Sequence, residues 1–379
     1  MKVLFVINSL HSKGNGLCAA VKRNIRELEK RGIEVRVLSG RNKTGKRQPE
    51  YELDDLTIIG FDSIISKQGY QFSKTNKKVI KEALEWADVV HIEEPFNIQI
   101  ATTRLAKKMN VPCVATYHLH PENLFASVKL SWSKLINGGL MLAWRNLVFN
   151  RCKIVHAPTK NVEDRLKRWK YKAEIRTFSN GLVLDELMHI KKENIKKDVY
   201  TIISIGRYSY EKDLITIIKS LKYSKYRDRI KLILAGKGPA EKGLKRYADK
   251  LYNSGIIKYP VEFGFHNLSE LQQIAQDADL YIHAAYIEVE GLSCMEAIQT
   301  GLVPIIARGH LTATSQFALD EKSTFKARDP KDLADKIDYW LSDDDRRFKE
   351  SKKYVGLGKK YSIDKSIDEM IKMYEDALK

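Results

Sequence analysis

The chain has 379 residues, of which 43% are hydrophobic, enough for two domains of roughly 150–200 residues with separate cores. Its four cysteines are scattered without a CxxC pair, so neither a disulfide framework nor a zinc site is expected. No apolar run reaches the ~18 residues that a membrane-spanning helix requires, and the short apolar start Met1–Asn8 predicts a first strand, not a signal peptide.

The formal net charge is +18, and it is unevenly distributed. Residues 1–190 hold 32 Lys and Arg against 19 Asp and Glu, a net charge of +13. So basic an N-terminal half favours an anionic surface, for which a membrane leaflet and nucleic acid are the candidates. The nucleic-acid interpretation is the weaker of the two because the sequence has no recognised nucleic-acid motif. A solvated, lysine-rich surface is the alternative to both.

Strand-like apolar runs alternate with amphipathic helical runs such as Leu17–Arg31 and Ile98–Met109. This alternation predicts an α/β fold with doubly wound parallel sheets. A charged segment, Lys191–Asp198, is the expected linker between two copies of the architecture. The predicted strands are Val3–Asn8, Ile33–Leu38, Val89–Ile92, Cys113–Tyr117, Val155–Ala157, Ile175–Phe178, Tyr200–Ile205, Ile230–Ala235, Val261–Phe263, Leu280–Ala284 and Val303–Ala307.

The segment Ser127–Lys153 interleaves apolar side chains, including Trp132 and Trp144, with basic ones, including Lys134 and Arg145. A basic amphipathic pattern with tryptophans is typical of helices that lie at a lipid interface. The alternative is a pair of helices packed in the core.

Two consecutive glycines, Gly138 and Gly139, are expected to divide that segment into two helices. A second basic run, which contains Lys167 and Arg168, follows it. We expect both stretches to face an anionic membrane if the interfacial interpretation holds.

Two histidines and a glutamate, His118, His120 and Glu122, follow the predicted strand Cys113–Tyr117. A lone histidine at a strand end is more often structural than catalytic. Here three polar side chains share one loop at the carboxyl end of a parallel strand, the edge at which such sheets bind ligands.

Cations follow the first predicted strand of the second domain. Arg207 and Lys212 flank a turn that opens a helix, next to Gly206. A guanidinium and an ammonium group at a helix N-terminus make a clamp for a diphosphate, and a merely charged loop is the alternative. The next strand is followed by the turn Gly236–Pro239, for which nucleotide binding and a purely structural turn are equally compatible with the sequence.

Two glutamates, Glu288 and Glu296, stand eight positions apart after the strand Leu280–Ala284. The first falls in the loop at the carboxyl end of a strand and the second about one turn into the next helix. Carboxylates there accept hydrogen bonds from sugar hydroxyls, and the loop at Gly291 offers backbone N–H groups to phosphate. An ordinary loop with chance acidic residues is the alternative.

The two glutamates, followed by Ala297, Ile298, Gly301 and Pro304, resemble the E-x7-E signature of retaining glycosyltransferases of the GT-B fold, especially glycosyltransferase family 4. Two further motifs, H-x-x-P-E-N from His118 and E-x-E-G-L-S-C from Glu288, most resemble diacylglycerol glucosyltransferases. The resemblance implies two Rossmann-like domains with doubly wound parallel sheets that face a cleft, and a C-terminal helix that crosses back to the first domain. It places an acceptor-binding domain at residues 1–185, a nucleotide-sugar-binding domain at 186–360 and the crossing helix at 361–379.

The same resemblance implies roles for individual residues. Glu288 touches the transferred sugar, Glu296 holds the ribose, Arg207 and Lys212 bind the pyrophosphate and stabilise the leaving group, and His118 bonds to the sugar. The remaining donor-binding positions that it implies are Gly16, Gly206, Gly238, Gly264, Phe265, Gly291 and Leu292.

The expected activity is retaining transfer of a hexose, with glucose preferred, from a UDP-sugar to a membrane lipid such as 1,2-diacylglycerol. We expect no cofactor, no metal and no nucleic-acid partner. A cytoplasmic monomer or weak dimer, peripheral on the inner face of the cell membrane, is expected. The alternatives are a transferase of capsule or cell-wall glycans that acts on a lipid-linked or soluble acceptor and, more remotely, a non-enzymatic sugar- or nucleic-acid-binding protein.

Overall fold

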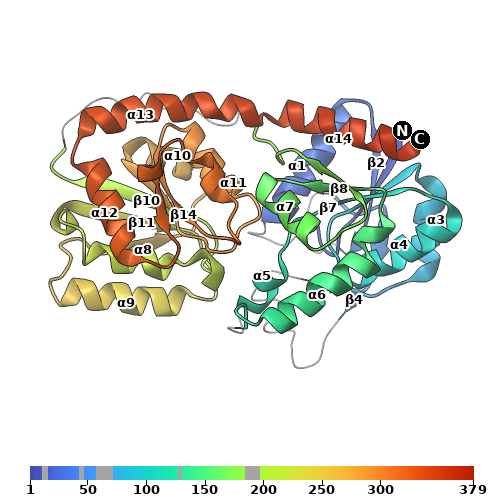
Figure 1. The fold of residues 1–379 in the computed structure, drawn as a ribbon, viewed down its shortest axis with the longest axis horizontal. Coiled ribbons are helices and arrows are strands. Elements are labelled where there is room, and N and C mark those ends of the chain that lie inside the picture. Colours follow the sequence, from blue (N-terminus) through green and yellow to red (C-terminus); the bar gives the residue numbers. More distant parts are fainter. Residues whose placement is uncertain (11–15, 42–46, 57–70, 127–129, 184–196) are drawn as a thin grey trace. The chain divides into compact units, whose positions relative to one another are not determined.

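The chain forms two compact units. The computed structural model describes residues 1–10, 16–41, 47–56, 71–126, 130–183 and 197–379. Unit 1 comprises Met1–Gly181 together with Ile363–Lys379, and unit 2 comprises Leu182–Ser362 (Figure 1). Most of the predicted linker, residues 191–196, lies outside the described residues.

Unit 1 is built on a parallel sheet in the order β3-β2-β1-β6-β7-β8-β9. Every residue of β6, β7 and β8 is buried, as expected for parallel strands with both faces covered. The sheet reverses its strand order between β1 and β6, so its switch point lies there. The strands are β1 (Lys2–Val6), β2 (Glu34–Gly40), β3 (Tyr51–Leu53), β6 (Val89–Ile92), β7 (Cys113–Thr116), β8 (Ile154–Ala157) and β9 (Glu174–Thr177).

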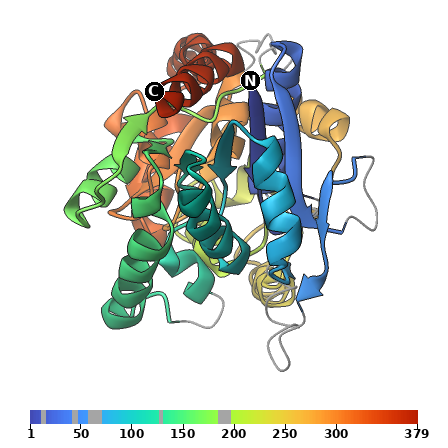
Figure 2. The same ribbon diagram turned by 90° about the vertical axis from the view of Figure 1, so that its right-hand side faces the viewer.

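Helices cover the sheet of unit 1, and several of them can be followed in Figure 2. Helices α1 and α14 contact each other, as do α3 and α4. A two-stranded antiparallel pair, β4 (Asp55–Leu56) with β5 (Phe72–Ser73), and the short helix η1 (Phe149–Arg151) complete the unit. The helices are α1 (Gly16–Lys30), α3 (Lys77–Trp86), α4 (Asn97–Met109), α5 (Pro121–Ala126), α6 (Lys134–Leu147), α7 (Lys160–Arg168) and α14 (Ile363–Leu378).

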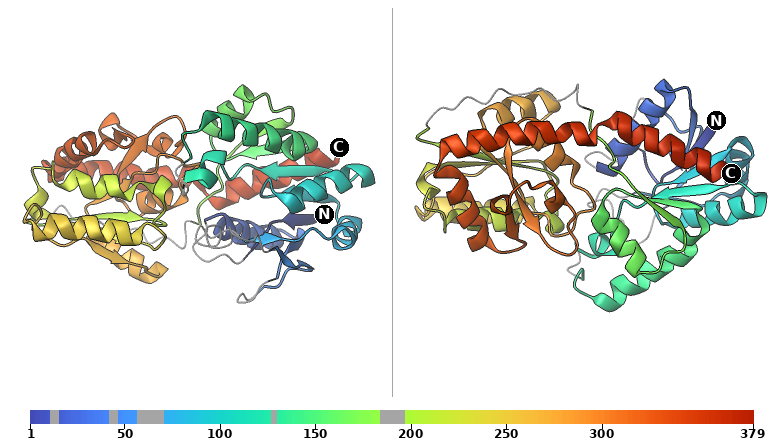
Figure 3. Two further views of the ribbon diagram at one scale, coloured as in Figure 1. Left: turned by 90° about the horizontal axis from the view of Figure 1, so that it is seen from below. Right: turned by 45° about the horizontal axis from the view of Figure 1, so that its top comes forward.

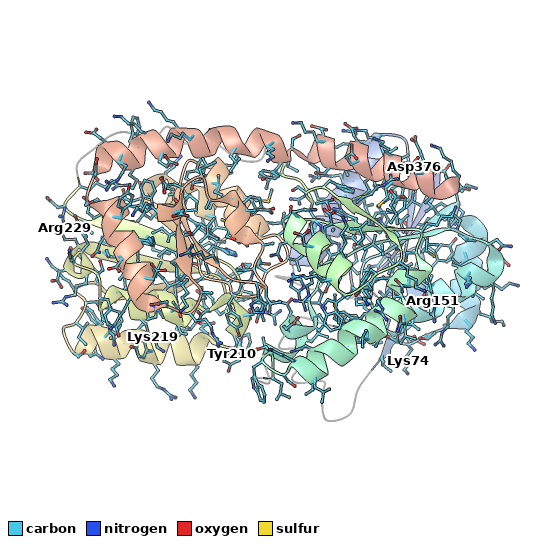
Figure 4. All side chains as sticks on the ribbon, viewed as in Figure 1. Lys74, Arg151, Tyr210, Lys219, Arg229 and Asp376 are labelled. Carbon is cyan, nitrogen blue, oxygen red and sulfur yellow. The ribbon has the colours of Figure 1, made fainter. Side chains whose placement is uncertain are left out.

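The C-terminal helix α14 belongs to unit 1, which confirms the predicted return of the chain to its first domain. Its inner face is apolar and includes Ile367, Met370 and Met373, each at most 1% exposed. Asp376, labelled in Figure 4, pairs with Arg176 of β9 at 2.8 Å. Burial of the apolar face is therefore the main contribution of α14, and the partly exposed ion pair adds less.

Unit 2 has a six-stranded parallel sheet in the order β12-β11-β10-β13-β14-β15. In chain order this is 3-2-1-4-5-6, the dinucleotide-binding arrangement, and it confirms the predicted doubly wound sheet. The switch point lies between β10 and β13, which pair at Ile202 and Ile203. The strands are β10 (Tyr200–Ile205), β11 (Ile230–Ala235), β12 (Glu262–Gly264), β13 (Leu280–His283), β14 (Val303–Arg308) and β15 (Thr324–Lys326).

The helices of unit 2 flank its sheet, and Figure 3 gives two further views of them. Helix α12 contacts α8 and α13, and α11 contacts α13. The short helices are η3 (Tyr210–Lys212), η4 (Arg227–Arg229), η5 (Thr314–Phe317), η6 (Glu321–Ser323) and η7 (Gly358–Tyr361). The longer ones are α8 (Leu214–Leu221), α9 (Glu241–Asn253), α10 (Leu268–Asp277), α11 (Leu292–Gln299), α12 (Pro330–Leu341) and α13 (Asp344–Leu357).

We predict that Ile367→Ala lowers the free energy of unfolding of unit 1 by about 2–5 kcal/mol, because Ile367 is 0% exposed and its removal leaves a cavity under α14. Urea unfolding of the full chain measures the loss. The matched control is Glu369→Ala on the exposed face of the same helix, expected within about 0.5 kcal/mol of wild type. A loss below about 1 kcal/mol for Ile367→Ala would contradict this account of α14.

Candidate active site

The loop after β13 places Glu288 beside Lys212. Lys212 is the last residue of η3, and its Nζ forms an ion pair with Glu288 Oε2. The two side chains are 23% and 17% exposed, so this pair is largely shielded from water. The sequence predicts both residues for the site but not their pairing, because 76 positions separate them.

The backbone of Glu288 is fixed independently of its side chain. Its N–H donates to the carbonyl of Leu311 at 2.9 Å, and its carbonyl accepts from the N–H of Ala313, also at 2.9 Å. Together with the bridge to Thr312, these bonds hold Glu288 as in a short parallel ladder. The carboxylate is therefore presented from a rigid loop, which is a requirement for precise placement of a ligand.

Glu288 is an anion at neutral pH. Burial alone would raise its pKa, but the charge of Lys212 and the contact with His283 outweigh burial and lower the pKa of Glu288 to about 2. The pKa of His283 is itself lowered by burial, so this histidine is neutral. The charge balance of the pair is thus one ammonium against one carboxylate.

His283, the last residue of β13, was missed by the sequence analysis. Its Nε2 lies 3.4 Å from Glu288 Oε2, and its Nδ1 lies 3.2 Å from the hydroxyl of Tyr281. That hydroxyl also lies 3.3 Å from Ser293 Oγ on α11. A histidine that ends a strand at the switch point was the available signal, but only the fold shows that it points at Glu288.

The turn into α11 requires a glycine at position 291. Gly291 has φ of +92°, and a Cβ there would lie 2.5 Å from Thr314 Oγ1. Leu292 then begins α11, and Glu296 is reached about one turn later, where it is partly exposed. These placements match the predicted layout of a loop carboxylate followed by a helical one.

Glycines also let the loops after β10 and β11 touch. Gly206 follows β10, and its carbonyl oxygen would overlap a Cβ placed on Gly236. A Cβ on Gly238 would lie 2.6 Å from the carbonyl oxygen of Tyr208. Packing of the two loops therefore explains these glycines, which favours the structural turn among the alternatives for Gly236–Pro239.

Gly264 and Phe265 lie at the end of β12. The carbonyl of Gly264 accepts from the N–H of Gly236 at 2.6 Å, so this loop adjoins the glycine turn. Phe265 is 64% exposed, with Lys237 Nζ 4.7 Å from its ring centroid. An exposed aromatic ring beside backbone groups is suited to stacking on a base. The carboxyl ends of β10–β13 thus carry most of the predicted donor residues.

His118 lies after β7 of unit 1 and is held by a residue that the sequence analysis missed. Its Nε2 lies 2.7 Å from Oε2 of Glu93, which follows β6. Glu93 is 1% exposed. Gly16 is the first residue of α1, and a Cβ there would meet nothing within 4 Å, so sterics place no demand on it.

Two predicted acceptor residues, His120 and Glu122, have side chains that point into unit 1, and their acceptor contacts stay predictions. His120 is fully buried, with its Nδ1 3.2 Å from the hydroxyl of Tyr117. Glu122 is 8% exposed, and Arg165 binds both of its carboxylate oxygens, at 2.7 and 2.8 Å. A buried carboxylate needs such a partner, so Glu122 anchors α5 to α7.

Helix α6 divides the predicted membrane-facing residues into two groups. Trp132 is 77% exposed, whereas Trp144 is 3% exposed and packs edge-on against Phe96. The prediction for Trp144 is therefore wrong, since its side chain belongs to the core. Arg145 donates to the carbonyl of Trp169 at 2.8 Å and is only partly exposed.

The predicted division at Gly138 and Gly139 is also wrong, because α6 continues through both glycines. The exposed side chains of this region, here called the α6 surface, include several large apolar ones and Lys134. Lys167 and Arg168 are exposed on α7, where Lys167 pairs with Glu163. The exposed apolar residues are Leu130, Trp132, Leu135, Ile136 and Leu142.

Within the described residues, no group of three or more His, Cys, Asp and Glu side chains is arranged to hold a metal ion. The helices in those ranges include none long and apolar enough to cross a membrane.

Comparison with known families agrees with this geometry. Residues 14–186 match the family model described as Glycosyltransferase Family 4, and residues 185–356 match Glycosyl transferases group 1. The two models together span both units, and the chain belongs to the GT-B glycosyltransferases.

Among characterised relatives, the chain is 28% identical to the alpha-monoglucosyldiacylglycerol synthase of Acholeplasma laidlawii over 309 residues, which cover 75% of each protein. Two solved structures share the fold. Anabaena HepE in complex with UDP and glucose has a TM-score of 0.74 at 15% identity and covers 99% of this chain and 100% of its own. Sucrose-phosphate synthase from Thermosynechococcus elongatus has a TM-score of 0.71 at 14% identity, with coverage of 99% and 98%.

We predict that Lys212→Met destabilises unit 2 by roughly 2 kcal/mol at pH 7, because Glu288 is left as a shielded, unpaired anion. The low pKa of Glu288 stabilises the folded state above the unfolded pKa of about 4.3, and this contribution is lost as the pH falls towards about 2. The difference in unfolding free energy between wild type and variant should therefore narrow over that interval.

Urea unfolding between pH 7 and pH 2.5 measures the difference. The control is Lys245→Met, which breaks an exposed pair with Glu241 and should cost at most about 0.5 kcal/mol at any pH. A constant difference between wild type and Lys212→Met across the whole pH range would contradict the assigned charge of Glu288.

Proposed function

We propose that this protein transfers a hexose, glucose by preference, from a UDP-sugar to a membrane lipid such as 1,2-diacylglycerol, with retention of the anomeric configuration. The observation that carries the proposal is the shielded Lys212–Glu288 pair at the switch point of unit 2, in a chain of the GT-B glycosyltransferases. A cation that can meet a diphosphate and a carboxylate that can meet a sugar hydroxyl lie there in direct contact.

Unit 2 would hold the donor at the carboxyl ends of β10–β13. Its strand order is that of dinucleotide-binding sheets, which take nucleotides at this edge. Phe265 would stack on the base, and Glu296 would accept hydrogen bonds from the ribose. The solved complex of HepE with UDP and glucose supports a nucleotide-sugar donor for a chain of this fold.

Arg207 and Lys212 would offset the negative charge that grows on the departing diphosphate, the task that a metal ion performs in other transferases. Glu288 would use its second oxygen, Oε1, for a hydroxyl of the hexose, since Oε2 is engaged by Lys212. In the transfer step the acceptor oxygen bonds to the anomeric carbon on the face from which the phosphate oxygen leaves. That phosphate oxygen takes the hydroxyl proton, so no protein nucleophile and no metal ion is required.

A lipid acceptor is supported by three observations. The relative from Acholeplasma laidlawii is a synthase of a glucosyldiacylglycerol. The α6 surface includes Trp132 and Leu135, 77% and 87% exposed, next in sequence to Lys134. Residues 1–190 carry a net charge of +13, which favours an anionic leaflet. Peripheral binding on the inner face of the cell membrane follows from the proposal.

The test of the donor site is Lys212→Ala. We predict a fall in kcat of about 100-fold or more with UDP-glucose, because one stabilising contact to the leaving diphosphate is lost. Transfer of radiolabelled glucose to diacylglycerol in vesicles measures it, with Lys245→Ala as a control that removes an exposed lysine of the same unit. Wild-type activity in Lys212→Ala would refute the proposed site.

The test of the acceptor offers diacylglycerol in anionic vesicles, an undecaprenyl-linked glycan and a soluble glycan in parallel, each with a panel of labelled nucleotide sugars. Product with diacylglycerol supports the proposal. Product only with one of the glycans refutes the lipid assignment and leaves the donor site intact.

The α6 surface generates a separate prediction. Leu135→Glu should weaken binding to vesicles of phosphatidylglycerol by about tenfold, because a buried leucine contributes roughly 1.5–3 kcal/mol at a lipid interface. Co-sedimentation with vesicles measures the affinity. Leu378→Glu is the matched control, because it introduces the same charge at an isolated exposed leucine of α14. Equal loss in both variants would show that charge alone, and not the α6 surface, governs binding.

A further inference from the structure

A continuous chain of buried polar groups crosses the centre of unit 1. It runs from Tyr374 of α14 through His91 of β6, Thr116 of β7 and His156 of β8 to the carbonyl of Phe178. The four side chains are at most 2% exposed. Because both histidines are shielded from water, the hydrogen-bond partners alone determine where their protons lie.

The direction of this buried chain is fixed at its Phe178 end. A backbone carbonyl can only accept, so His156 Nε2 must donate to it across 2.7 Å. Burial lowers the pKa of His156 to about 3, so the ring is neutral and its Nδ1 is an acceptor. The hydroxyl of Thr116 then donates to that Nδ1 at 3.1 Å.

The remaining hydrogen bonds, towards α14, are constrained in the same way. With its proton given to His156, Thr116 Oγ1 accepts from His91 Nε2 at 2.7 Å. Burial also lowers the pKa of His91, so its Nδ1 is an acceptor, and the hydroxyl of Tyr374 donates to it at 2.7 Å. All four hydrogen bonds therefore point one way, from α14 to Phe178.

Glu93 joins this chain to His118. Its Oε1 lies 3.7 Å from the N–H of His91 Nε2, and its Oε2 lies 2.7 Å from His118 Nε2. Burial opposes ionisation, but the neighbouring histidines outweigh it and lower the pKa of Glu93. Oε1 accepts no hydrogen bond within the described residues. The proton on His91 Nε2 is donated to Thr116, so at 3.7 Å His91 acts on Glu93 through the dipole of its ring and not through a hydrogen bond.

A carboxylate can only accept, so His118 must carry a proton on Nε2. In the neutral ring, Nδ1 is then left with a lone pair, and within the described part of the chain no hydrogen bond to Nδ1 is formed. The His118 side chain is 8% exposed, so its remaining edge is accessible to a small group.

We propose that Glu93 is a positioning residue that holds His118 with its proton on Nε2, so that Nδ1 accepts a hydrogen bond from a substrate hydroxyl. Tyr374 contributes by holding the His91 ring, whose Nε2 side faces Glu93 at 3.7 Å and favours its charge. This inference rests on the proposed function for the identity of the substrate. The proposal gives the C-terminal helix α14 a role in the reaction beyond packing, since its Tyr374 is the first hydrogen-bond donor in the buried series of polar groups.

The tautomer of His118 can be read without substrate. Long-range proton–nitrogen NMR of the full chain labelled at histidine distinguishes the two neutral forms, and the signal of His118 is assigned by its loss in His118→Asn. We expect the Nε2–H form in wild type. In Glu93→Gln, whose amide can donate as well as accept, the His118 signal should shift towards the Nδ1–H form.

The kinetic arm uses UDP-glucose with and without diacylglycerol vesicles. Glu93→Gln should lower kcat by roughly 10- to 100-fold with a smaller change in KM, and Tyr374→Phe by roughly fivefold. Loss in both hydrolysis and transfer assigns the hydroxyl to the hexose, and loss in transfer alone assigns it to the acceptor. Tyr171→Phe removes another buried hydroxyl of unit 1 that does not belong to this series of hydrogen bonds. It should leave the tautomer of His118 and the rate of transfer unchanged.

An unchanged His118 tautomer in Glu93→Gln overturns the proposal, as does an Nδ1–H form in wild type. If Glu93→Gln does not fold, Tyr374→Phe is the deciding variant. A wild-type tautomer of His118 together with a wild-type rate in Tyr374→Phe then overturns the proposal. The proposed function is tested separately: full activity of Lys212→Ala would refute it. That result would not affect the measured tautomer of His118.

Discussion

The Lys212–Glu288 ion pair is the interaction on which the proposed donor site of unit 2 depends. Without a cation, a charged carboxylate this shielded would destabilise the folded unit, so Lys212 both stabilises the charge of Glu288 and holds one of its oxygens. The backbone ladder to residues 311–313 fixes the backbone position of Glu288. Charge and position are thus set before any donor arrives, which is the condition for electrostatic catalysis.

The two units place a shielded carboxylate at corresponding positions of their sheets. Each doubly wound sheet reverses its strand order once, and each places an acidic residue beyond a strand next to that point, Glu288 after β13 and Glu93 after β6. In each unit a histidine contacts the carboxylate, at 3.4 Å in unit 2 and 2.7 Å in unit 1. A buried carboxylate with a fixed partner therefore recurs, although the two sequences show no repeat.

Periodic patterns predicted the sheets, the helix α1 and the positions of Glu288 and Glu296, because those depend on local spacing and on the edge at which parallel strands end. Side-chain direction was not predictable from the same patterns. Glu122 and Trp144 look exposed in the sequence but are buried by Arg165 and Phe96, which lie far away in the chain. Conversely, Glu93 and His283 look like ordinary residues at strand ends until the fold brings His118 and Glu288 to them.

The anomeric configuration of the product tests the account most directly. The protein would be incubated with UDP-α-glucose and diacylglycerol in anionic vesicles, and the proton coupling at the anomeric carbon of the purified glycolipid measured by NMR. The account predicts a glucosyldiacylglycerol with the small coupling of an α-linkage, since attack occurs on the face from which the phosphate leaves. A β-linked product would contradict the assigned mechanism, and the absence of any glucosylated lipid would contradict the assigned acceptor.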